Sequence, residues 1–485
     1  MSLTKTVSLF AGTTLALTGV AFGSTEANNS LNGDALAQIN ELRAEIADLK
    51  ARNGENWLTE QRAAEIKGLV QDVLADADTR ASLQGGGSTA GYDNGFFIAS
   101  SDGNFRLNIN GGASLRWSIN NRDFVGAGEQ TNWGFQSRHA NVMLTGHIVD
   151  PSWKYNVSFG FFDASGDYTG STAGEAFLTD WYAMKDFGGW YLKAGQFVAP
   201  FSRERALSDY GLQTLDHTNS SYVFGLGRTQ GLEVGCIGDW FRSAVSFSDG
   251  VSATSVTQNN GYLGGAGGSS PASDFAITGR VEGKLAGTWA QFEDDQAWRG
   301  EEFGLLIGLG GFYQSGHTGD SRFNFGSTGP AGALTGSEGS EFGFTADATA
   351  SWSGFSVTGA LFYNQADSEW VTTAGGAGDF ESYGAFVQAG FFLTDEFELV
   401  ARYEYGDVGN IAALESANTQ STISFGANYY FAKNRCKWQT EVAYALHSVG
   451  TFEVAGNGWY DDGSDINGND EDGQLVFRTG LTVSF

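Results

Sequence analysis

The sequence predicts an all-β protein, a transmembrane antiparallel β-barrel of about sixteen strands preceded by a short α-helical coiled coil. Three observations predict it: the composition, long runs in which apolar and polar residues alternate, and connections that are short and long in turn. The 485 residues include 70 glycines and 4 prolines, with 14% aromatic and 17% charged residues. This composition suits glycine-flanked strands with aromatic girdles better than long helices or a disordered chain.

The strand pattern begins at Phe105, where apolar residues alternate with polar ones as far as Ile119. This run is much longer than the roughly five or six residues of a strand in a soluble sheet. The last run, 474–485, repeats the pattern and ends on an aromatic residue of its apolar face, Phe485. Between them we expect strands at 133–149, 153–163, 177–186, 190–198, 229–238, 240–248, 273–286, 301–314, 340–352, 355–366, 381–394, 396–406, 420–432 and 436–448.

The connections between these runs alternate in length along almost the whole chain. Bacterial membrane barrels have tight turns at one end and long loops at the other, an alternation that a soluble sandwich hardly produces. One connection, 287–300, is long where a tight turn is due, and a miscount there would change the strand number. The tight connections are 150–152, 187–189, 239, 353–354, 395 and 433–435, and long ones include 199–228, 249–272 and 449–472.

The alternation also predicts closure and a pore. Lipid cannot hydrogen-bond backbone groups, so strands with an outward apolar face require a barrel without edges. The inward faces are polar and would line water. An eight-stranded barrel fills with its own side chains, whereas about sixteen strands leave an aqueous channel.

Residues 1–27 read as a secretory signal peptide, with Lys5 before an apolar run over 7–22 and small residues after it. A membrane anchor is the alternative, but the run is short and rich in threonine and glycine. We expect residues 28–90 to be a periplasmic helical region ending in a glycine-rich linker, and 91–485 to be the barrel. Apolar residues recur at the three- and four-residue intervals of a coiled coil, at Ile39, Leu42, Ile46 and Leu49. The alternative is a single amphipathic helix that packs on another domain.

Charge and chemistry exclude several function classes. A formal net charge of −29 without basic clusters argues against nucleic-acid binding. The two cysteines and five histidines are too scattered for a metal site, and we expect no cofactor and no enzymatic activity. The acidic segment 461–472 fails the EF-hand pattern and is expected to be a solvated outer loop, with divalent-ion bridging to lipopolysaccharide.

Several motifs resemble the phosphate-selective porin O and P family. They are Ala194-Gly195-Gln196-Phe197-Val198-Ala199-Pro200-Phe201-Ser202-Arg203-Glu204, Gly227-Arg228-Thr229-Gln230-Gly231-Leu232, Asp102-Gly103-Asn104-Phe105 and Ser137-Arg138-His139-Ala140. The resemblance implies a trimeric outer-membrane porin through which solutes pass. The family commonly has two arginines where this chain has Ser137 and Arg138, and no run of inward basic residues is evident. The resemblance therefore does not imply phosphate as the substrate.

Loop 199–228 is the third long connection, and in porins of this size that loop commonly folds into the lumen. Opposed charges across a constriction would act on passing ions. Alternatively, the charged residues from Arg203 to Arg205 brace the loop against the wall, and both can hold together. The candidate constriction residues are Arg203, Glu204, Arg205, Asp209, Asp216 and Arg228, with His217 beside them.

The alternation of inward and outward side chains along each strand predicts which residues line the pore wall. The inward basic residues are Arg106, Arg116, Lys154, Lys193, Arg242 and Arg402, followed by Arg280, Lys284, Lys437 and Arg478. Acidic residues of the same parity are fewer, namely Asp180, Glu233, Glu282, Asp347, Glu398, Glu404 and Glu441. The excess negative charge then lies in outer loops and the N-terminal region, screened beyond about 8 Å at physiological salt. We therefore expect a weak preference for anions.

The function expected is passive diffusion of small hydrophilic solutes and ions across the cell outer membrane. The expected partners are the lipid bilayer, lipopolysaccharide, the permeating ions and two further copies of the chain. A second hypothesis is a structural anchor, whose coiled coil binds cell-wall material and tethers the envelope. Conductance in a planar bilayer separates the two, because an anchor with a plugged lumen would be silent.

Overall fold

The computed structural model describes residues 40–45, 47–48, 67, 88–93, 95–124, 128–161, 176–251, 273–317, 338–366, 380–407, 409, 419–447, 459 and 473–485. The chain divides into two compact units, 1–86 and 87–485. In the first unit the described residues are helical, and Leu42 is exposed. The predicted signal peptide and most of the predicted coiled coil lie outside the described residues. Among the helices of the described part, none is long and apolar enough to cross a membrane.

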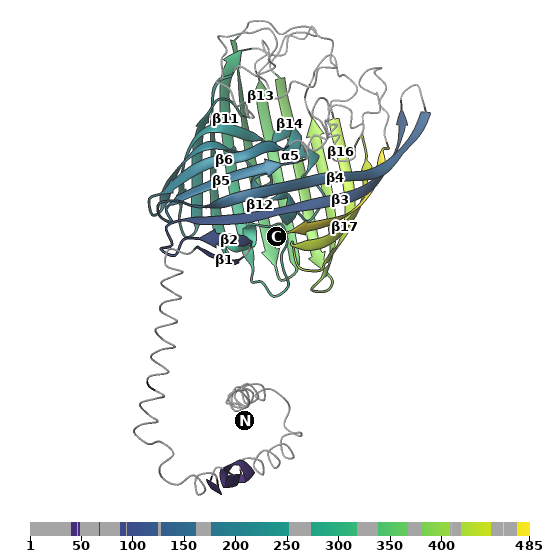
Figure 1. Cartoon of the computed structure of the whole chain (residues 1–485). Coiled ribbons are helices and arrows are strands. Elements are labelled where there is room, and N and C mark those ends of the chain that lie inside the picture. Colours follow the sequence, from purple (N-terminus) through teal and green to yellow (C-terminus); the bar gives the residue numbers. More distant parts are fainter. Residues whose placement is uncertain are drawn as a thin grey trace. The chain divides into compact units, whose positions relative to one another are not determined.

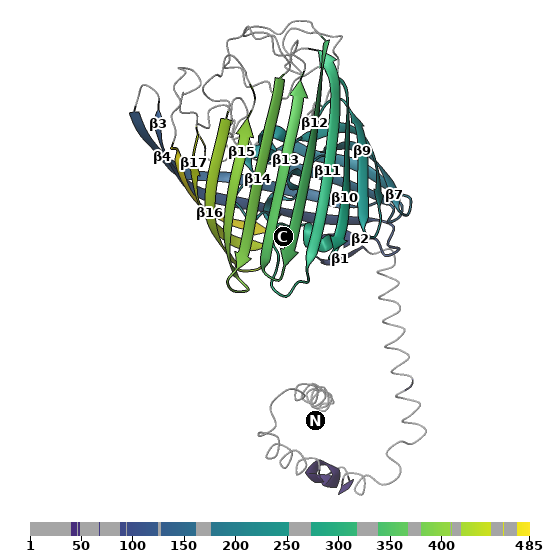
Figure 2. The same cartoon turned by 180° about the vertical axis from the view of Figure 1, so that it is seen from behind.

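In the second unit, sixteen antiparallel strands form a closed barrel (Figures 1 and 2), because each strand from β3 to β18 pairs with the next and β18 pairs back with β3. Their bounds are β3 (Arg106–Phe124), β4 (Gly128–His147), β5 (Trp153–Gly160), β6 (Phe177–Asp186), β7 (Trp190–Val198), β8 (Arg228–Ile237), β9 (Phe241–Ser248), β10 (Ser273–Ala286), β11 (Gly304–His317), β12 (Glu338–Trp352), β13 (Phe355–Ala366), β14 (Phe380–Phe392), β15 (Phe397–Asp407), β16 (Thr419–Tyr430), β17 (Cys436–Ala445) and β18 (Leu475–Ser484). The predicted strand number is confirmed.

A short hairpin precedes the barrel and was not predicted from the sequence. It consists of β1 (Thr89–Tyr92) and β2 (Phe96–Ala99), and β2 pairs with the first residues of β3, from Arg106 to Ile109. Strand β18 begins its own pairing with β3 at Gly112. The hairpin therefore covers the part of β3 that extends beyond the end of β18.

The two faces of the wall have opposite chemistry, as β15 illustrates. Leu399 and Tyr403 are exposed on the outside, whereas the alternate residues Glu398, Arg402 and Glu404 are buried inside. A soluble protein has the reverse arrangement, with its apolar side chains in the core. The apolar exterior matches lipid as its solvent, and the closed backbone pairing leaves no edge for lipid to meet.

The lumen is partly filled by residues 199–227, the connection between β7 and β8. This segment contains α4 (Arg203–Ala206), the 3-10 turn η1 (Asp209–Gly211) and α5 (Asn219–Phe224). An apolar cluster joins it to the wall; this cluster includes Phe201, Phe224, Leu226, Phe312, Phe362 and Phe386. We call residues 199–227 the lumen loop.

Glycines on the inner wall allow this close approach. A Cβ atom at Gly384 would lie 2.1 Å from the ring of Phe224, and one at Gly390 would lie 2.1 Å from the side-chain nitrogen of Gln213. A larger residue at either position would displace the side chain of Phe224 or of Gln213. Part of the high glycine content therefore serves the packing of the loop.

The irregular connection 287–303 does not change the strand count. It contains the 3-10 turn η2 (Trp289–Phe292), and its backbone meets the lumen loop where Asp295 N–H donates to the carbonyl of Gly211 at 3.0 Å. Its length is explained by this contact, because a tight turn could not reach the loop. The strand expected from residue 301 begins instead at Gly304.

Candidate pore constriction

Asp216 is the deepest charged residue of the lumen loop and anchors it to β3 and β18. Its carboxylate accepts hydrogen bonds from Arg116 of β3 and, at 3.1 Å, from Nη1 of Arg478 of β18. Its backbone carbonyl accepts a hydrogen bond from Nη1 of Arg402 at 3.0 Å. All these side chains are buried, so the charges compensate one another rather than face water.

Gln213 makes the corresponding anchor to β13, β14 and β15. Its side-chain nitrogen donates to Oε1 of Glu398 at 2.6 Å and to Oγ of Ser356 at 2.7 Å. Its side-chain oxygen accepts from Nε2 of Gln388 at 3.0 Å. Lys437 of β17 adds bonds to the carbonyls of Tyr210 and Leu212, at 2.8 and 2.6 Å. The lumen loop is thus bonded to strands β13, β14, β15 and β17.

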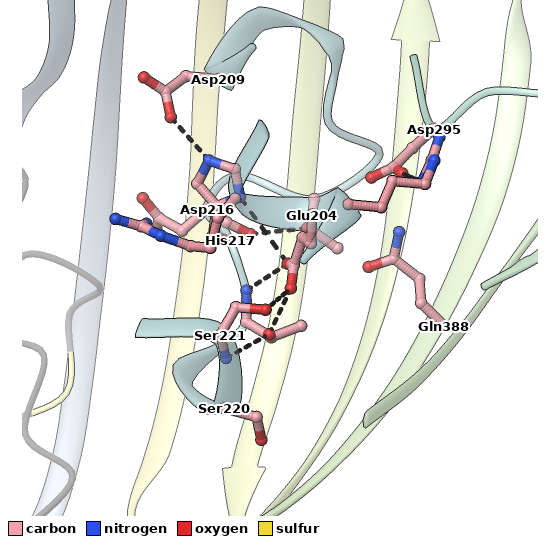
Figure 3. Close-up of polar contacts among 12 residues, drawn as sticks. Glu204, Asp209, Asp216, His217, Ser220, Ser221, Asp295 and Gln388 are labelled. Atoms are coloured by element: carbon pink, nitrogen blue, oxygen red, sulfur yellow. Dashed lines mark hydrogen bonds and ion pairs between the residues drawn. The ribbon is translucent and has the colours of Figure 1, made fainter. Parts of the chain in front are cut away.

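Arg203 links the lumen loop to the connection 287–303. Its guanidinium contacts Oδ1 of Asp295 at 3.0 Å and donates to the carbonyl of Asp294 at 2.7 Å. Burial raises the pKa of the Asp294 carboxyl. Figure 3 shows Asp295 beside this part of the loop. Arg203 therefore joins the lumen loop to this connection rather than to a strand of the wall.

Glu204 stabilises the start of α5 from within the loop. Its carboxylate accepts hydrogen bonds from the backbone N–H and the hydroxyl of Thr218, both at 2.7 Å, and from the hydroxyl of Ser221 (Figure 3). Thr218 is the N-cap residue of α5, and its own oxygen accepts from the N–H of Ser221. A helix this short needs such partners, because isolated short helices are unstable in water.

A cavity of about 460 Å³ lies on the other side of the loop, between the loop and strands β4 to β8. The wall contributes His139, Asp180, Lys193 and Arg228, and the loop contributes Arg205, Asp209, His217 and Tyr222. A second cavity of about 400 Å³ shares Lys193, Val198, Ala206 and Leu207 with the first, and its other lining residues include Glu233, Arg242, Arg280 and Glu282. The two cavities therefore adjoin along one side of the lumen.

Most of the cations beside these cavities are paired with carboxylates. Arg228 holds Asp180 through two bonds, of 3.1 and 2.9 Å, and Nζ of Lys193 lies 2.7 Å from Oε1 of Glu233. Arg205 is different: its guanidinium lies 4.5 Å above the ring of Tyr222, and its Nε is 3.5 Å from the Leu226 carbonyl. Within the described ranges, no carboxylate lies at ion-pair distance from Arg205.

The predicted wall residues fall into three groups. Arg106 and Lys154 lie near the end of the barrel with the tight turns, paired with Asp93 at 3.1 Å and Asp186 at 3.4 Å. Lys193 and Arg242 line the cavities, whereas Arg116 and Arg402 lie buried beneath the lumen loop. Of the predicted loop residues, Arg205, Asp209 and Arg228 border the larger cavity, whereas Glu204 and Asp216 are buried.

Sequence reasoning missed Tyr222, the ring beneath Arg205, and Asp295, the partner of Arg203. Tyr222 had no signal in the sequence. The unusual length of 287–300 was noticed, and it could have suggested a segment that reaches into the lumen.

A comparison with family models matches residues 108–449 to the family described as phosphate-selective porin O and P. This match covers more than half of the chain. The chain belongs to the phosphate-selective porin O and P family. This porin is therefore a channel of the outer membrane that passes small solutes.

Among the solved structures that this porin resembles, the first of the following supports the fold. An anion-selective porin from Comamonas acidovorans superposes with a TM-score of 0.50 at 12% identity, covering 78% of this chain and 99% of that one. A loop-deletion mutant of OmpT from Vibrio cholerae gives 0.49 at 11% identity (79% and 100%). OmpF from Salmonella typhi in complex with daunomycin gives 0.47 at 11% identity (82% and 100%). A comparison with curated protein sequences finds no match.

Proposed function

We propose that solutes cross this porin on one side of its lumen, between the lumen loop and β4 to β8, and that the passage weakly prefers anions. On the opposite side the lumen loop lies against the wall, where Asp216 and Gln213 of the loop bond to wall side chains and Lys437 of β17 bonds to the loop. The adjoining cavities, by contrast, have several polar and charged side chains among their lining residues. Arg205 carries the proposal of anion preference, because it faces the larger cavity and none of the described carboxylates lies at ion-pair distance from it.

This support differs from the count of inward basic residues along the strands. Arg116, Arg402 and Arg478 are inside the barrel but buried beneath the lumen loop, where Asp216, Glu404 and Glu441 neutralise them. Buried, compensated charges act weakly on an ion in the cavity. The net effect of the lining therefore depends on few groups, which is why the proposed preference is weak.

Arg205→Gln is expected to lower the chloride-to-potassium permeability ratio about twofold to fivefold, because one charge within about 8 Å acts on both ions with opposite sign. The measurement is the reversal potential of the purified porin in a planar bilayer under a KCl gradient. Arg205→Lys keeps the charge and is the matched control, for which the ratio should change little. A native channel that is clearly cation-selective would contradict the proposal and would indicate that acidic loops control entry.

Conductance itself separates a channel from the structural anchor. We expect open-channel currents from the native chain, whereas an anchor with a plugged lumen would give none. No contact among the described residues favours the anchor.

We also propose that the chain assembles as a homotrimer through its N-terminal helices. The spacing of Ile39, Leu42, Ile46 and Leu49 predicts an apolar stripe that a single helix cannot bury by itself, and the Leu42 side chain is 53% exposed. Leu42→Cys is expected to yield oxidative crosslinks between copies on non-reducing gels. Arg43→Cys, on another face of the same helix, is the control and should crosslink less. Equal crosslinking at both positions, or none at position 42, would count against the coiled coil.

A further inference from the structure

We propose that His139 and His217 make the ion selectivity of this porin depend on pH, with the preference for anions increasing when the rings gain protons. The inference rests on the proposed passage through the larger cavity, because both rings line it together with Asp209. It concerns how that passage is regulated.

The two histidines belong to a chain of alternating carboxylates and imidazoles. Nε2 of His217 is 3.0 Å from Oδ1 of Asp209, and its Nδ1 is 3.9 Å from Oε1 of Glu204 (Figure 3). Nδ1 of His139 is 3.4 Å from Oδ2 of the same Asp209, and its Nε2 is 3.6 Å from Oδ1 of Asp216. The order is therefore Glu204, His217, Asp209, His139, Asp216, and it joins the lumen loop to β4.

Each of the two rings lies between two carboxylates. A neutral imidazole has one N–H and can donate to only one of its two neighbouring carboxylates, whereas an imidazolium donates from both nitrogens. Both rings are buried, and Nε2 of His139 and Nδ1 of His217 have no hydrogen-bond partner among the described residues. Protonation would give each of these nitrogens a hydrogen directed toward a carboxylate that is already close.

Charged groups on several other elements also lie around the two histidines and their carboxylates. Arg116 of β3 and Arg478 of β18 already neutralise Asp216. Arg402 and Glu404 of β15 pair at 3.0 Å, and both interact electrostatically with Glu204. Beside the cavity lie Arg205, the Arg228 and Asp180 pair and the Lys193 and Glu233 pair, and the ring of Tyr222 meets His217 edge-on at 5.8 Å.

The sign of the cluster follows from these groups. Glu441 of β17 contacts Arg478 at 3.1 Å and Arg402 at 3.6 Å, so it belongs to the same network. Five carboxylates (Glu204, Asp209, Asp216, Glu404 and Glu441) and three guanidiniums (Arg116, Arg402 and Arg478) leave two negative charges when both histidines are neutral. Two added protons bring the net charge of these groups to zero. The network opposes Arg205 when the histidines are neutral and no longer opposes it when they are protonated, so an ion in the cavity then meets a less negative wall.

The test is the chloride-to-potassium permeability ratio of the purified full-length porin, measured by reversal potential at about pH 7.5 and about pH 5.5. For the native chain we expect the ratio to rise at least about threefold at the lower pH, since the added charges act at about 8 Å through a water-like medium. The double variant H139Q/H217Q should lose this rise. H147Q, which replaces a histidine of the same strand outside both cavities, should keep it.

Each outcome bears on the proposal. A ratio in the native chain that does not change with pH would overturn it without help from any variant. A rise that persists in H139Q/H217Q would also overturn it, because the titrating groups would then lie elsewhere. Heat-modifiable migration on gels checks that the variants are folded, and the single variants H139Q and H217Q should each keep part of the rise. Absence of current at both pH values would reject the proposed passage itself, a failure distinct from a constant ratio.

Discussion

Replacing Asp216 by asparagine is expected to raise single-channel conductance severalfold and to make it noisy, because the lumen loop would lose its anchor to β3 and β18. The substitution removes the carboxylate that Arg116 and Arg478 share in a buried site. Removing one partner of a buried ion pair costs about 3–5 kcal/mol, because the remaining charge has no solvent to compensate it. The lumen loop is tied to the wall there, so the cost is most easily relieved by release of the loop.

The measurement is conductance in planar bilayers, together with the uptake rate of a large hydrophilic solute into proteoliposomes. Asp150→Asn is the control, because Asp150 is partly exposed in a tight turn and pairs with Lys185 at 3.7 Å. Its conductance should equal that of the native porin. Native-like conductance in the Asp216→Asn channel, with the barrel folded, would show that the remaining contacts hold the loop unaided.

Deleting Phe485 is expected to reduce severalfold the amount of folded, heat-modifiable barrel in outer membranes. Phe485 completes the closure of the barrel, since its N–H donates to the Gly111 carbonyl at 2.9 Å and its own carbonyl accepts from the Gly111 N–H at 3.2 Å. Its ring lies on the outer face, 6.0 Å from the ring of Phe96 in β2. The deletion removes both the last backbone pair and the terminal aromatic residue.

Phe485→Trp keeps the chain length and the aromatic character and should assemble normally. Phe485→Ala separates the two contributions, because it keeps the backbone pair and removes the ring. If the deletion leaves the yield of folded barrel unchanged, neither the pair nor the ring is needed for assembly.

The strands could be predicted because each obeys a simple local rule. Lipid outside and polar surroundings inside impose a period of two on every strand, and β15 or β18 shows it over its whole length. The hairpin of β1 and β2 could not be predicted in this way. Its strands have four residues each, and they are determined by pairing with the end of β3.

The constriction was only partly predictable. The alternation along a strand tells which side chains point inward, but it does not tell which of them the lumen loop buries. Lys193 and Arg402 both point inward, yet the first borders a cavity and the second is buried beneath the lumen loop. The difference depends on the path of residues 199–227, which is set by contacts with strands far away in the sequence. The pairing of His139 with Asp209 and His217 depends on the same path, so their scattered positions gave no signal.

The fit between the lumen loop and the inner wall has a consequence for chimeras. Gly384 and Gly390 leave space for Phe224 and Gln213, and the connection 287–303 supplies Asp295 to Arg203. A loop transplanted from a relative would meet a wall shaped for different side chains. Swapping permeation properties between members of the family therefore requires exchange of the loop together with its glycines and its opposing turn, as one cassette.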